Sequence, residues 1–161
     1  MDFAAIETPT GTVEIAVDDG VLVSLQFVDR SDAPPDDPAG IAVRLRAYFA
    51  GELAALGEIP VRFDRGTPFQ REVWAALCAI PPGETISYAE LARRVGRPSA
   101  FRAVGSANGQ NPIGVVVPCH RVIAADGTLG GYGGGLERKR WLLEHEGALD
   151  TTNAVLPGLR T

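Results

Sequence analysis

The sequence predicts an α/β protein of the α+β kind, with a small N-terminal sheet-and-helix domain followed by a mostly helical C-terminal domain. Three observations support this prediction: apolar and polar residues alternate early in the chain, helix-capping sequences follow residue 65, and the charge balance changes near residue 64. We therefore place the domains at residues 1–64 and 65–150 and expect an irregular tail at 151–161.

The N-terminal domain begins with a predicted β-hairpin. Residues 11–28, GTVEIAVDDGVLVSLQFV, alternate apolar and polar on both sides of Asp18-Asp19-Gly20, the pattern of two strands joined by a glycine-containing turn. Residues 31–40 are rich in proline and acid and predict a mobile loop. Residues 41–53 carry apolar side chains at helical spacing, and residues 59–63, IPVRF, predict a short strand.

Capping sequences define the helices of the C-terminal domain. Thr67-Pro68-Phe69-Gln70 combines a threonine N-cap, a proline at the first helical position and a glutamine at the third, and predicts a helix that Pro81-Pro82-Gly83 ends. Ser87-Tyr88-Ala89-Glu90 has the same form, and Ser99 is expected to cap a third helix. Two short helices joined by a three- or four-residue turn containing glycine indicate a helix-turn-helix.

The rest of the domain leads to a cysteine and ends in a helix. Residues 113–117, IGVVV, predict a strand that runs into Pro118-Cys119-His120. Residues 130–135, GGYGGG, are too flexible to be there for packing. The last helix is expected at residues 136–146, ended by Gly147.

Composition excludes several classes of protein. No apolar run approaches the roughly 18–20 residues of a membrane span, so a cytoplasmic protein without a membrane partner is expected. The two cysteines, Cys78 and Cys119, allow at most one disulfide and show no metal-ligand spacing with a histidine. We expect no metal and no cofactor, and we interpret Cys78 as a small buried apolar residue.

Charge is distributed unevenly along the chain. Residues 1–64 hold 12 acidic and 4 basic side chains, whereas residues 65–150 hold 8 acidic and 10 basic ones. Between Arg93 and Arg121 there are five arginines and no acidic residue. This window is either an anion-facing surface or an ordinary solvated helix face.

Cys119 and His120 are adjacent, which raises the question of a reactive pair. A cysteine attacks as its thiolate, so a nucleophilic site needs a base to take the thiol proton. Neighbours on a strand point to opposite faces, so direct contact requires a turn or a helical start at Pro118, and a bridging water would also serve. Glu146 is a candidate to orient the base, because a carboxylate in the last turn of a helix is disfavoured by the helix dipole.

These segments together resemble the O6-alkylguanine-DNA alkyltransferases, a family that repairs alkylated guanine in DNA. The resemblance covers TPFQREVW, GETISYAELA, RAVGSANGQNP, VVVPCHRVI and GGYGGGLERKRWLL, with YFAGEL as a weaker match in the first domain. PCHRV is highly specific, and the 27-residue spacing from Cys119 to Glu146 agrees with the family pattern. The resemblance implies a ribonuclease H-like N-terminal domain and a winged-helix-like C-terminal domain.

The resemblance also implies site residues. Cys119 would accept the alkyl group irreversibly. His120 would deprotonate the Cys119 thiol through a water molecule, and Glu146 would orient the histidine. The implied catalytic residues are Cys119, His120, Glu146, Asn111 and Tyr88. The implied DNA-binding residues are Arg102, Arg93, Arg94, Arg97, Ala100, Phe101 and Arg121. The implied substrate-binding residues are Tyr88, Val122, Tyr132, Gly133 and Gly134.

Individual roles follow from the same resemblance. Asn111 would brace the turn beneath the site, Arg102 would fill the space left by the flipped nucleotide, and Tyr88 would donate to the leaving guanine. Val122 would contact the base edge through its backbone, and residues 132–133 would close over the base. Lys139 matches the lysine of the motif, without an assigned role.

The sequence departs from the family at two positions. Gly133 stands where some members have serine, so only a backbone donor remains there. Phe101 stands where a small residue is usual, and its ring either wedges against DNA or packs in the core. No cysteine cluster precedes the first domain, so the zinc of some members is not implied.

Two other classes of protein remain open at this point. A cysteine hydrolase could use Cys119, His120 and Glu146 as a triad and would turn over repeatedly. A non-enzymatic DNA-binding module, either a regulator or a lesion sensor, could use the helix pair alone. The expected partner is double-stranded DNA containing O6-alkylguanine, bound by a monomer, with O4-alkylthymine repair and cooperative binding left open.

Overall fold

The computed structural model describes residues 1–149 as two compact units. The first unit contains residues 1–65 and the segment Pro112–Val116, and the second contains Gly66–Asn111 and the chain from Val117 onward. Residues 112–116 therefore return to the first unit, although the sequence division groups them with the second. The tail expected at 151–161 lies outside the described residues.

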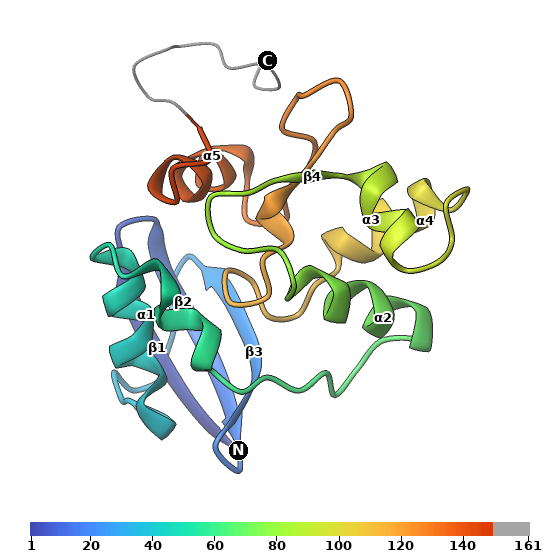
Figure 1. Ribbon diagram of the computed structural model, residues 1–161. Helices are drawn as coiled ribbons and strands as arrows, with labels where there is room; N and C mark the ends of the chain where they lie inside the picture. Colours follow the sequence, from blue (N-terminus) through green and yellow to red (C-terminus); the bar gives the residue numbers. More distant parts are fainter. Residues whose placement is uncertain (150–161) are drawn as a thin grey trace. The chain divides into compact units, whose positions relative to one another are not determined.

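The first unit is a three-stranded antiparallel sheet with a helix packed against it (Figure 1). The strands follow chain order, and the predicted hairpin is confirmed, with its turn at Asp19 and Gly20. The first strand, which sequence analysis did not predict, pairs along its whole length with the second. The elements are β1 (Asp2–Thr8), β2 (Gly11–Asp18), β3 (Val21–Val28), η1 (Pro38–Gly40), α1 (Ile41–Phe49) and η2 (Leu53–Glu58).

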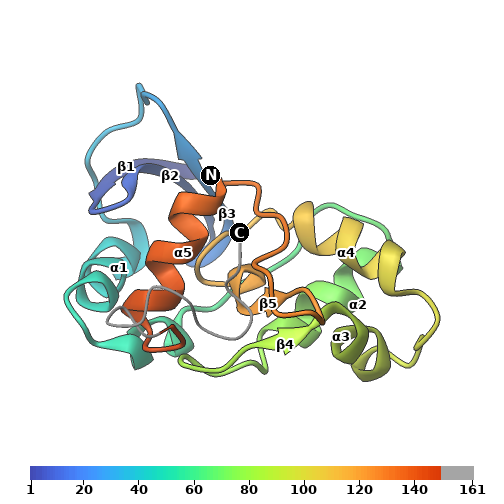
Figure 2. The same ribbon diagram turned by 90° about the horizontal axis from the view of Figure 1, so that it is seen from above.

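The core of this unit lies between the sheet and α1 (Figure 2). Ile6, Val13 and Ile15 are buried on the strands, and Leu45 and Tyr48 are buried on the helix. The helical spacing predicted for residues 41–53 thus corresponds to a buried helix face, although the helix ends at Phe49.

Two predicted strands are absent from the described residues. Residues 59–63 contribute one parallel bridge, from Val61 to Leu22, and residues 113–117 contribute one, from Ile113 to Leu25. The second prediction was wrong because the chain turns at Val115, whose φ is +67°. The apolar side chains of Ile113, Val115 and Val117 are buried, which explains the apolar run. Burial does not require an extended strand.

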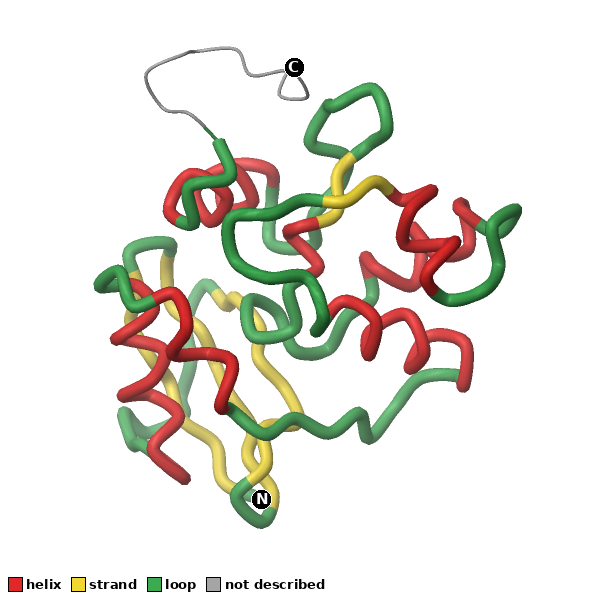
Figure 3. The backbone as a smooth tube through the Cα atoms, in the orientation of Figure 1, coloured by secondary structure: helices red, strands yellow, loops and turns green. Residues whose placement is uncertain are grey.

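The second unit consists mainly of helices and loops, with two short strands (Figure 3). Its buried apolar residues include Val73, Leu77, Leu91, Val104 and Leu142. The strands pair in parallel, with Ile86 opposite Val122. The elements are α2 (Pro68–Leu77), β4 (Ile86–Ser87), α3 (Tyr88–Arg94), α4 (Phe101–Gly109), η3 (Cys119–Arg121), β5 (Val122–Ile123) and α5 (Leu136–His145).

The capping predictions had different outcomes. The capping box at Thr67 and Gln70 is complete in both directions. Ser87 accepts a hydrogen bond from the Glu90 amide at 3.0 Å, but the Glu90 carboxylate accepts from two arginines instead of returning to Ser87. Ser99 does not cap α4, because that helix begins one residue later than predicted and Ala100 is its N-cap. The α3–α4 connection is accordingly longer than the predicted turn.

Cys78 is exposed, which corrects its interpretation as a buried apolar residue. It directly follows α2, on the outer side of the helix end, and its thiol lies 3.5 Å from the Trp74 carbonyl. No helix within residues 1–149 has the length and apolar character that crossing a membrane would require.

Trp74 joins α2 to α4 and limits the space beside it. Its indole Nε1 donates to the Ala107 carbonyl at 2.8 Å, and its ring lies so close to Gly66 that a methyl group there would come within 2.5 Å of the ring. Gly66 has a φ of +98°, and Gly96 has a φ of +74° with no atom within 4 Å of an added Cβ. Both glycines have a positive φ, which disfavours any side chain, but only at Gly66 would an added Cβ clash with a neighbour.

We expect Gly66→Ala to lower the free energy of unfolding by about 2–4 kcal/mol, because left-handed backbone strain and overpacking add. Gly96→Ala is the matched control and should cost only about 1–2 kcal/mol. Urea denaturation of both variants measures the difference. Equal losses would show that the Trp74 contact is not a constraint.

Candidate active site

Cys119 and His120 lie in a single turn of 3-10 helix rather than on a strand. The Arg121 amide donates to the Pro118 carbonyl at 3.0 Å, which closes the turn immediately before β5. The cysteine and histidine side chains therefore do not alternate across a sheet. This is the helical start at Pro118 that direct contact between the two side chains would require.

His120 is buried and is oriented by Glu146. Its Nε2 lies 2.8 Å from Oε2 of Glu146, and both side chains are fully buried. The carboxylate can only accept, so Nε2 carries the proton and Nδ1 presents its lone pair. Nδ1 is buried and has no hydrogen-bond partner within residues 1–149. The geometry thus leaves the basic nitrogen of the ring available for a proton.

The charge state of His120 follows from its surroundings. Burial lowers the pKa of His120 below its usual 6.5, and the hydrogen bond to Glu146 opposes that change without reversing it. The ring is therefore neutral at neutral pH. A neutral imidazole is the form that can act as a general base.

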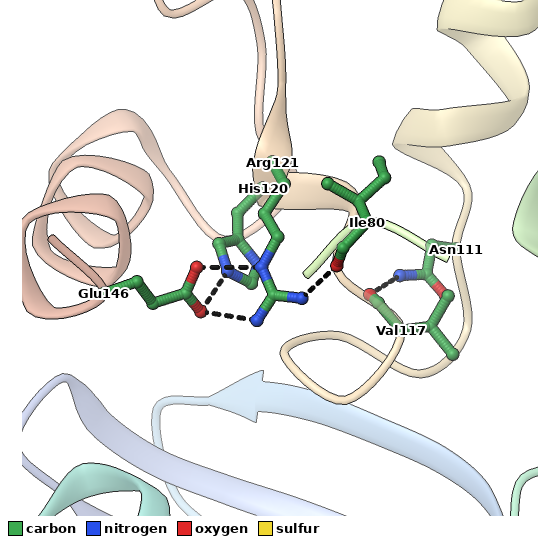
Figure 4. A network of polar contacts seen from close by, with 6 residues as sticks. All are labelled: Ile80, Asn111, Val117, His120, Arg121 and Glu146. Atoms are coloured by element: carbon green, nitrogen blue, oxygen red, sulfur yellow. Dashed lines mark hydrogen bonds and ion pairs between the residues drawn. The ribbon is translucent and has the colours of Figure 1, made fainter. Parts of the chain in front are cut away.

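Glu146 is the C-cap residue of α5, and its carboxylate is held by two side chains (Figure 4). Burial favours the protonated acid, but hydrogen bonds from Arg121 and His120 outweigh it and keep the pKa of Glu146 well below its ordinary range. Glu146 is therefore ionised. Its unfavourable place at the helix end is offset by these partners.

Arg121 occupies the interior of the unit and not the DNA-facing surface assigned to it from the sequence. Its Nε donates to Oε1 of Glu146 and its Nη2 to Oε2, both at 2.8 Å, and its Nη1 donates to the Ile80 carbonyl at 2.6 Å. The residue is only 6% exposed. The prediction of a DNA contact was wrong because the nearest carboxylate, 25 residues away in sequence, meets it inside the fold.

Cys119 is buried beside two residues that favour its ionised form. Burial raises the pKa of the Cys119 thiol, and a hydrogen bond from Asn111 and the positive charge of Lys139 only partly oppose this. The resting group is therefore a thiol, which needs a base before it can attack. Asn111 also donates to the Val117 carbonyl at 2.8 Å.

Asn108, which sequence analysis did not single out, supports the same turn. Its Nδ2 donates to the Cys119 carbonyl at 3.3 Å from a buried position on α4. A polar residue on the buried face of a predicted helix was the available signal, but the sequence does not indicate which backbone group it meets.

Lys139 is completely buried and donates to three backbone carbonyls. Its Nζ binds the carbonyl oxygens of Val122 at 2.7 Å, Gly131 at 3.1 Å and Leu129. Burial lowers the pKa of Lys139 to about 8, and the negative charge of an ionised Cys119 would raise it. This lysine joins α5 to β5 and to the glycine-rich loop. The Val122 carbonyl, expected at the base edge, is already bound by Lys139.

The glycine-rich loop lies directly against Tyr88. A Cβ added at Gly130 would come within 2.7 Å of the Tyr88 hydroxyl oxygen, and one added at Gly105 of α4 would lie 3.6 Å from the same ring. Burial raises the pKa of Tyr88, opposed by a hydrogen bond with the Gly131 backbone. The phenol is therefore protonated and can donate.

The other loop residues expected in the substrate pocket adjoin the same site. Burial is also the main cause that raises the pKa of Tyr132 well above 10, with a further contribution from Cys119. A Cβ added at Gly133 would lie 3.7 Å from the Gly109 carbonyl oxygen, and the Gly134 carbonyl accepts from Arg138 at 2.9 Å. The loop thus has defined contacts on both sides of Tyr132.

Most of the arginine window is paired with acids from outside it. Arg93 and Arg94 both bind Glu90, and Arg97 lies 3.6 Å from Glu72 and over the Phe69 ring. No acidic residue lies within the window in the sequence, but in the fold Glu90 and Glu72 lie beside its arginines. Its surface charge is therefore smaller than the count of arginines suggests.

Arg102 and its neighbours form the exposed start of α4. Arg102 is exposed and has no hydrogen bond or ion pair in the described part of the chain. Phe101 is 49% exposed, so its ring does not pack in the core, and Ala100 is half-buried at the N-cap. No cluster of three or more candidate metal ligands occurs among residues 1–149.

The geometry defines a protein whose buried thiol is served by a histidine–glutamate pair, and comparison with known proteins gives its family. The model of the 6-O-methylguanine DNA methyltransferase DNA-binding domain matches residues 68–148. The methylated-DNA–protein-cysteine methyltransferase of Mycolicibacterium paratuberculosis is 49% identical over 155 residues, covering 91% of this chain and 92% of that protein. That of Shigella flexneri is 56% identical over 113 residues, which are 70% of this chain and 66% of that protein.

Comparison with solved structures gives the same family. The chain matches Mycobacterium tuberculosis OGT in complex with DNA with a TM-score of 0.81 and 46% identity, covering 92% of this chain and 94% of that chain. It matches the methyltransferase of Pyrococcus kodakaraensis with a TM-score of 0.68 and 28% identity, covering 91% and 98%. The chain therefore belongs to the O6-methylguanine DNA methyltransferase family. The resemblance seen in the sequence and the mixed α/β fold are confirmed.

The tautomer and charge of His120 can be measured by ¹⁵N NMR. The chain has two histidines, so His145→Gln leaves a single imidazole to observe. We expect a proton on Nε2, none on Nδ1, and a titration midpoint below 6.5, because burial disfavours the cation. Since the folded state then binds fewer protons than the unfolded state, this residue's contribution to stability is present above pH 6.5 and is lost as the pH falls from 6.5 through the lower folded-state midpoint. A proton on Nδ1, or a midpoint above 6.5, would contradict the base assigned to this site.

Proposed function

We propose that this chain is a DNA repair protein that transfers the alkyl group of O6-alkylguanine irreversibly to the sulfur of its own Cys119. The observation that supports this most directly is the arrangement of a buried thiol, a neutral histidine and an ionised glutamate on one short turn and one helix end. The relatives that cover most of the chain are named methylated-DNA–protein-cysteine methyltransferases. Under this proposal the protein is a single-turnover methyltransferase.

The reaction begins with proton transfer from Cys119 to Nδ1 of His120 through a bridging water molecule. Glu146 stabilises the imidazolium that forms, because its carboxylate accepts the Nε2 proton. The thiolate sulfur then attacks the alkyl carbon as the bond from that carbon to O6 breaks. The electron pair of the broken bond remains on the guanine, and the sulfur becomes a thioether.

The leaving guanine needs a proton donor as it gains negative charge. Tyr88 is protonated, lies beside the glycine-rich loop and is the first residue of α3, directly after β4. We assign it as the hydrogen-bond donor that stabilises the departing base. Val122, Tyr132, Gly133 and Gly134 are assigned to the walls of the base pocket.

Access to O6 requires the nucleotide to leave the duplex. A base stacked and paired in DNA cannot reach a buried thiol until it rotates out. We propose that α3 and α4 form the DNA-binding helix pair and that Arg102, free of an internal acid, fills the space left behind. The exposed Phe101 would wedge beside it, with Ala100 allowing close approach. Arg93, Arg94 and Arg97 would contribute phosphate contacts, weakened by their acidic partners.

Finer features of the fold and partner belong to the same proposal. The antiparallel sheet with its helix supports a ribonuclease H-like first domain, and the helix pair with β4 and β5 supports a winged-helix-like second domain. The monomeric state, cytoplasmic location, O4-alkylthymine repair and cooperative binding stay predictions.

The irreversible transfer predicts at most one alkyl group per chain. A thioether on Cys119 has no leaving group that would restore the thiol, so excess O6-methylguanine duplex should add one methyl mass and then stop. Intact-protein mass spectrometry with peptide mapping measures both the number and the position. Cys119→Ser should take up none. Continued release of free product beyond one equivalent would favour the cysteine hydrolase instead.

The role of Arg102 predicts a difference between duplex DNA and a free base. Free O6-benzylguanine needs no extrusion, so Arg102→Ala should slow transfer from duplex DNA by more than about tenfold and transfer from the free base by less than about twofold. Phe101→Ala should show the same pattern with a smaller effect. Arg140→Ala is the control, since the side chain of this exposed arginine has no hydrogen bond or ion pair within residues 1–149 and no assigned role.

Single-turnover rates with both substrates give the comparison. If Arg102→Ala slows both reactions by the same factor, the residue supports the pocket or the fold and has no part in extrusion.

A further inference from the structure

Arg121 holds the Glu146 carboxylate in a geometry that no other residue described in this site duplicates. Two nitrogens of one guanidinium bind the two carboxylate oxygens at 2.8 Å, and the third nitrogen is fixed on the Ile80 carbonyl at 2.6 Å (Figure 4). Oε2 is shared, because it also meets Nε2 of His120 at 2.8 Å. The arginine therefore fixes the plane of the carboxylate that orients the base.

The same arginine is a positive charge next to the residue that must accept a proton. The groups that act on the His120 ring are Glu146 and Lys139 from α5 and Arg121 from its own turn. Glu146 favours the imidazolium, whereas Arg121 and Lys139 disfavour it. Cys119 interacts with Lys139, and Tyr132 interacts with Cys119, Glu146 and Arg138. Tyr88 interacts with Cys119.

We propose that Arg121 is a positioning residue for alkyl transfer, which orients Glu146 toward His120 and, through its charge, keeps the imidazole unprotonated until the thiol proton arrives. This inference rests on the proposed transfer to Cys119. Arg121 touches neither the thiol nor the expected substrate, so it acts only through Glu146 and His120.

The two parts of this role respond differently to substitution. Arg121→Met removes both the two hydrogen bonds to Glu146 and the positive charge. Glu146 then favours protonation of His120 without an opposing charge from residue 121. Arg121→Lys retains a charge but loses the two-point attachment. Arg121→Met should therefore change the pH at which His120 becomes protonated, whereas Arg121→Lys should mainly change the rate of alkyl transfer.

The experiment measures single-turnover transfer from free O6-benzylguanine to Cys119 between pH 5 and pH 8. In the parent protein the rate should fall only below pH 6.5, where His120 becomes protonated. In Arg121→Met the midpoint of that fall should rise by about one pH unit or more, because the removed charge shares Oε2 of Glu146 with the ring and disfavours its protonation. Arg121→Lys should keep the parent midpoint and lower the plateau rate by about threefold to tenfold.

A double-mutant cycle tests whether Arg121 acts through Glu146. If it does, Arg121→Met should cost much less in a Glu146→Gln background than in the parent, because the carboxylate that it orients is gone. Arg140→Met is the matched control and should leave the profile unchanged. Affinity for undamaged duplex DNA should be the same in parent and Arg121→Met, with an unchanged salt dependence.

The outcomes are distinguishable. If the parent protein does not alkylate Cys119, the proposed function fails. If the parent does so, and Arg121→Met lowers the rate with an unmoved midpoint, the arginine is only structural. If Arg121→Met does not fold, Arg121→Lys still decides, since a parent-like plateau in that variant would overturn the positioning role. If Arg121→Met weakens duplex binding and lowers its salt dependence by the amount expected for one phosphate contact, Arg121 binds DNA as the sequence predicted.

Discussion

The buried Glu146 carboxylate is the constraint on which the second unit depends. An ionised carboxylate removed from water is tolerated only when hydrogen-bonded and paired, and here Arg121 and His120 both bind it. Those partners come from the turn at Pro118, and the carboxylate comes from the end of α5. The turn that carries the nucleophile and the helix that closes the unit must therefore meet. Losing either partner would leave a buried charge uncompensated.

This constraint explains why the site is inactive at rest. Burial keeps Cys119 as a thiol, so the nucleophile is not in its reactive form until the neutral His120 ring takes its proton. The same burial that raises the cost of forming the thiolate also removes water that would compete for the proton and the alkyl group. A protein consumed by one transfer gains from such a resting state, because an unpaired thiolate would react with other electrophiles.

Sequence reasoning succeeded where local patterns determine local structure, and it failed where a contact joins distant segments. The hairpin at Asp18–Gly20, the cap at Thr67 and the helix ending near Gly147 each depend on a few neighbouring residues. Arg121 was assigned to the surface because no acid is near it in sequence, yet its partner follows 25 residues later. Residues 113–117 were taken for a strand because apolar runs indicate burial and not backbone conformation. The family resemblance identified the Cys119–His120–Glu146 set, but it did not reveal that Arg121 shares the carboxylate.

The glycine-rich loop shows the same difference between composition and packing. Six residues with five glycines indicate a flexible segment with no packing role, yet Gly130 is packed against Tyr88 so closely that a side chain could not fit. Lys139 binds the loop carbonyls of Leu129 and Gly131 together with that of Val122. Glycine is needed here because backbone, rather than side chains, forms the wall beside the phenol. The loop that would close over a flipped base is therefore attached to α5, the same helix that carries Glu146, and substrate contacts and base orientation share one support.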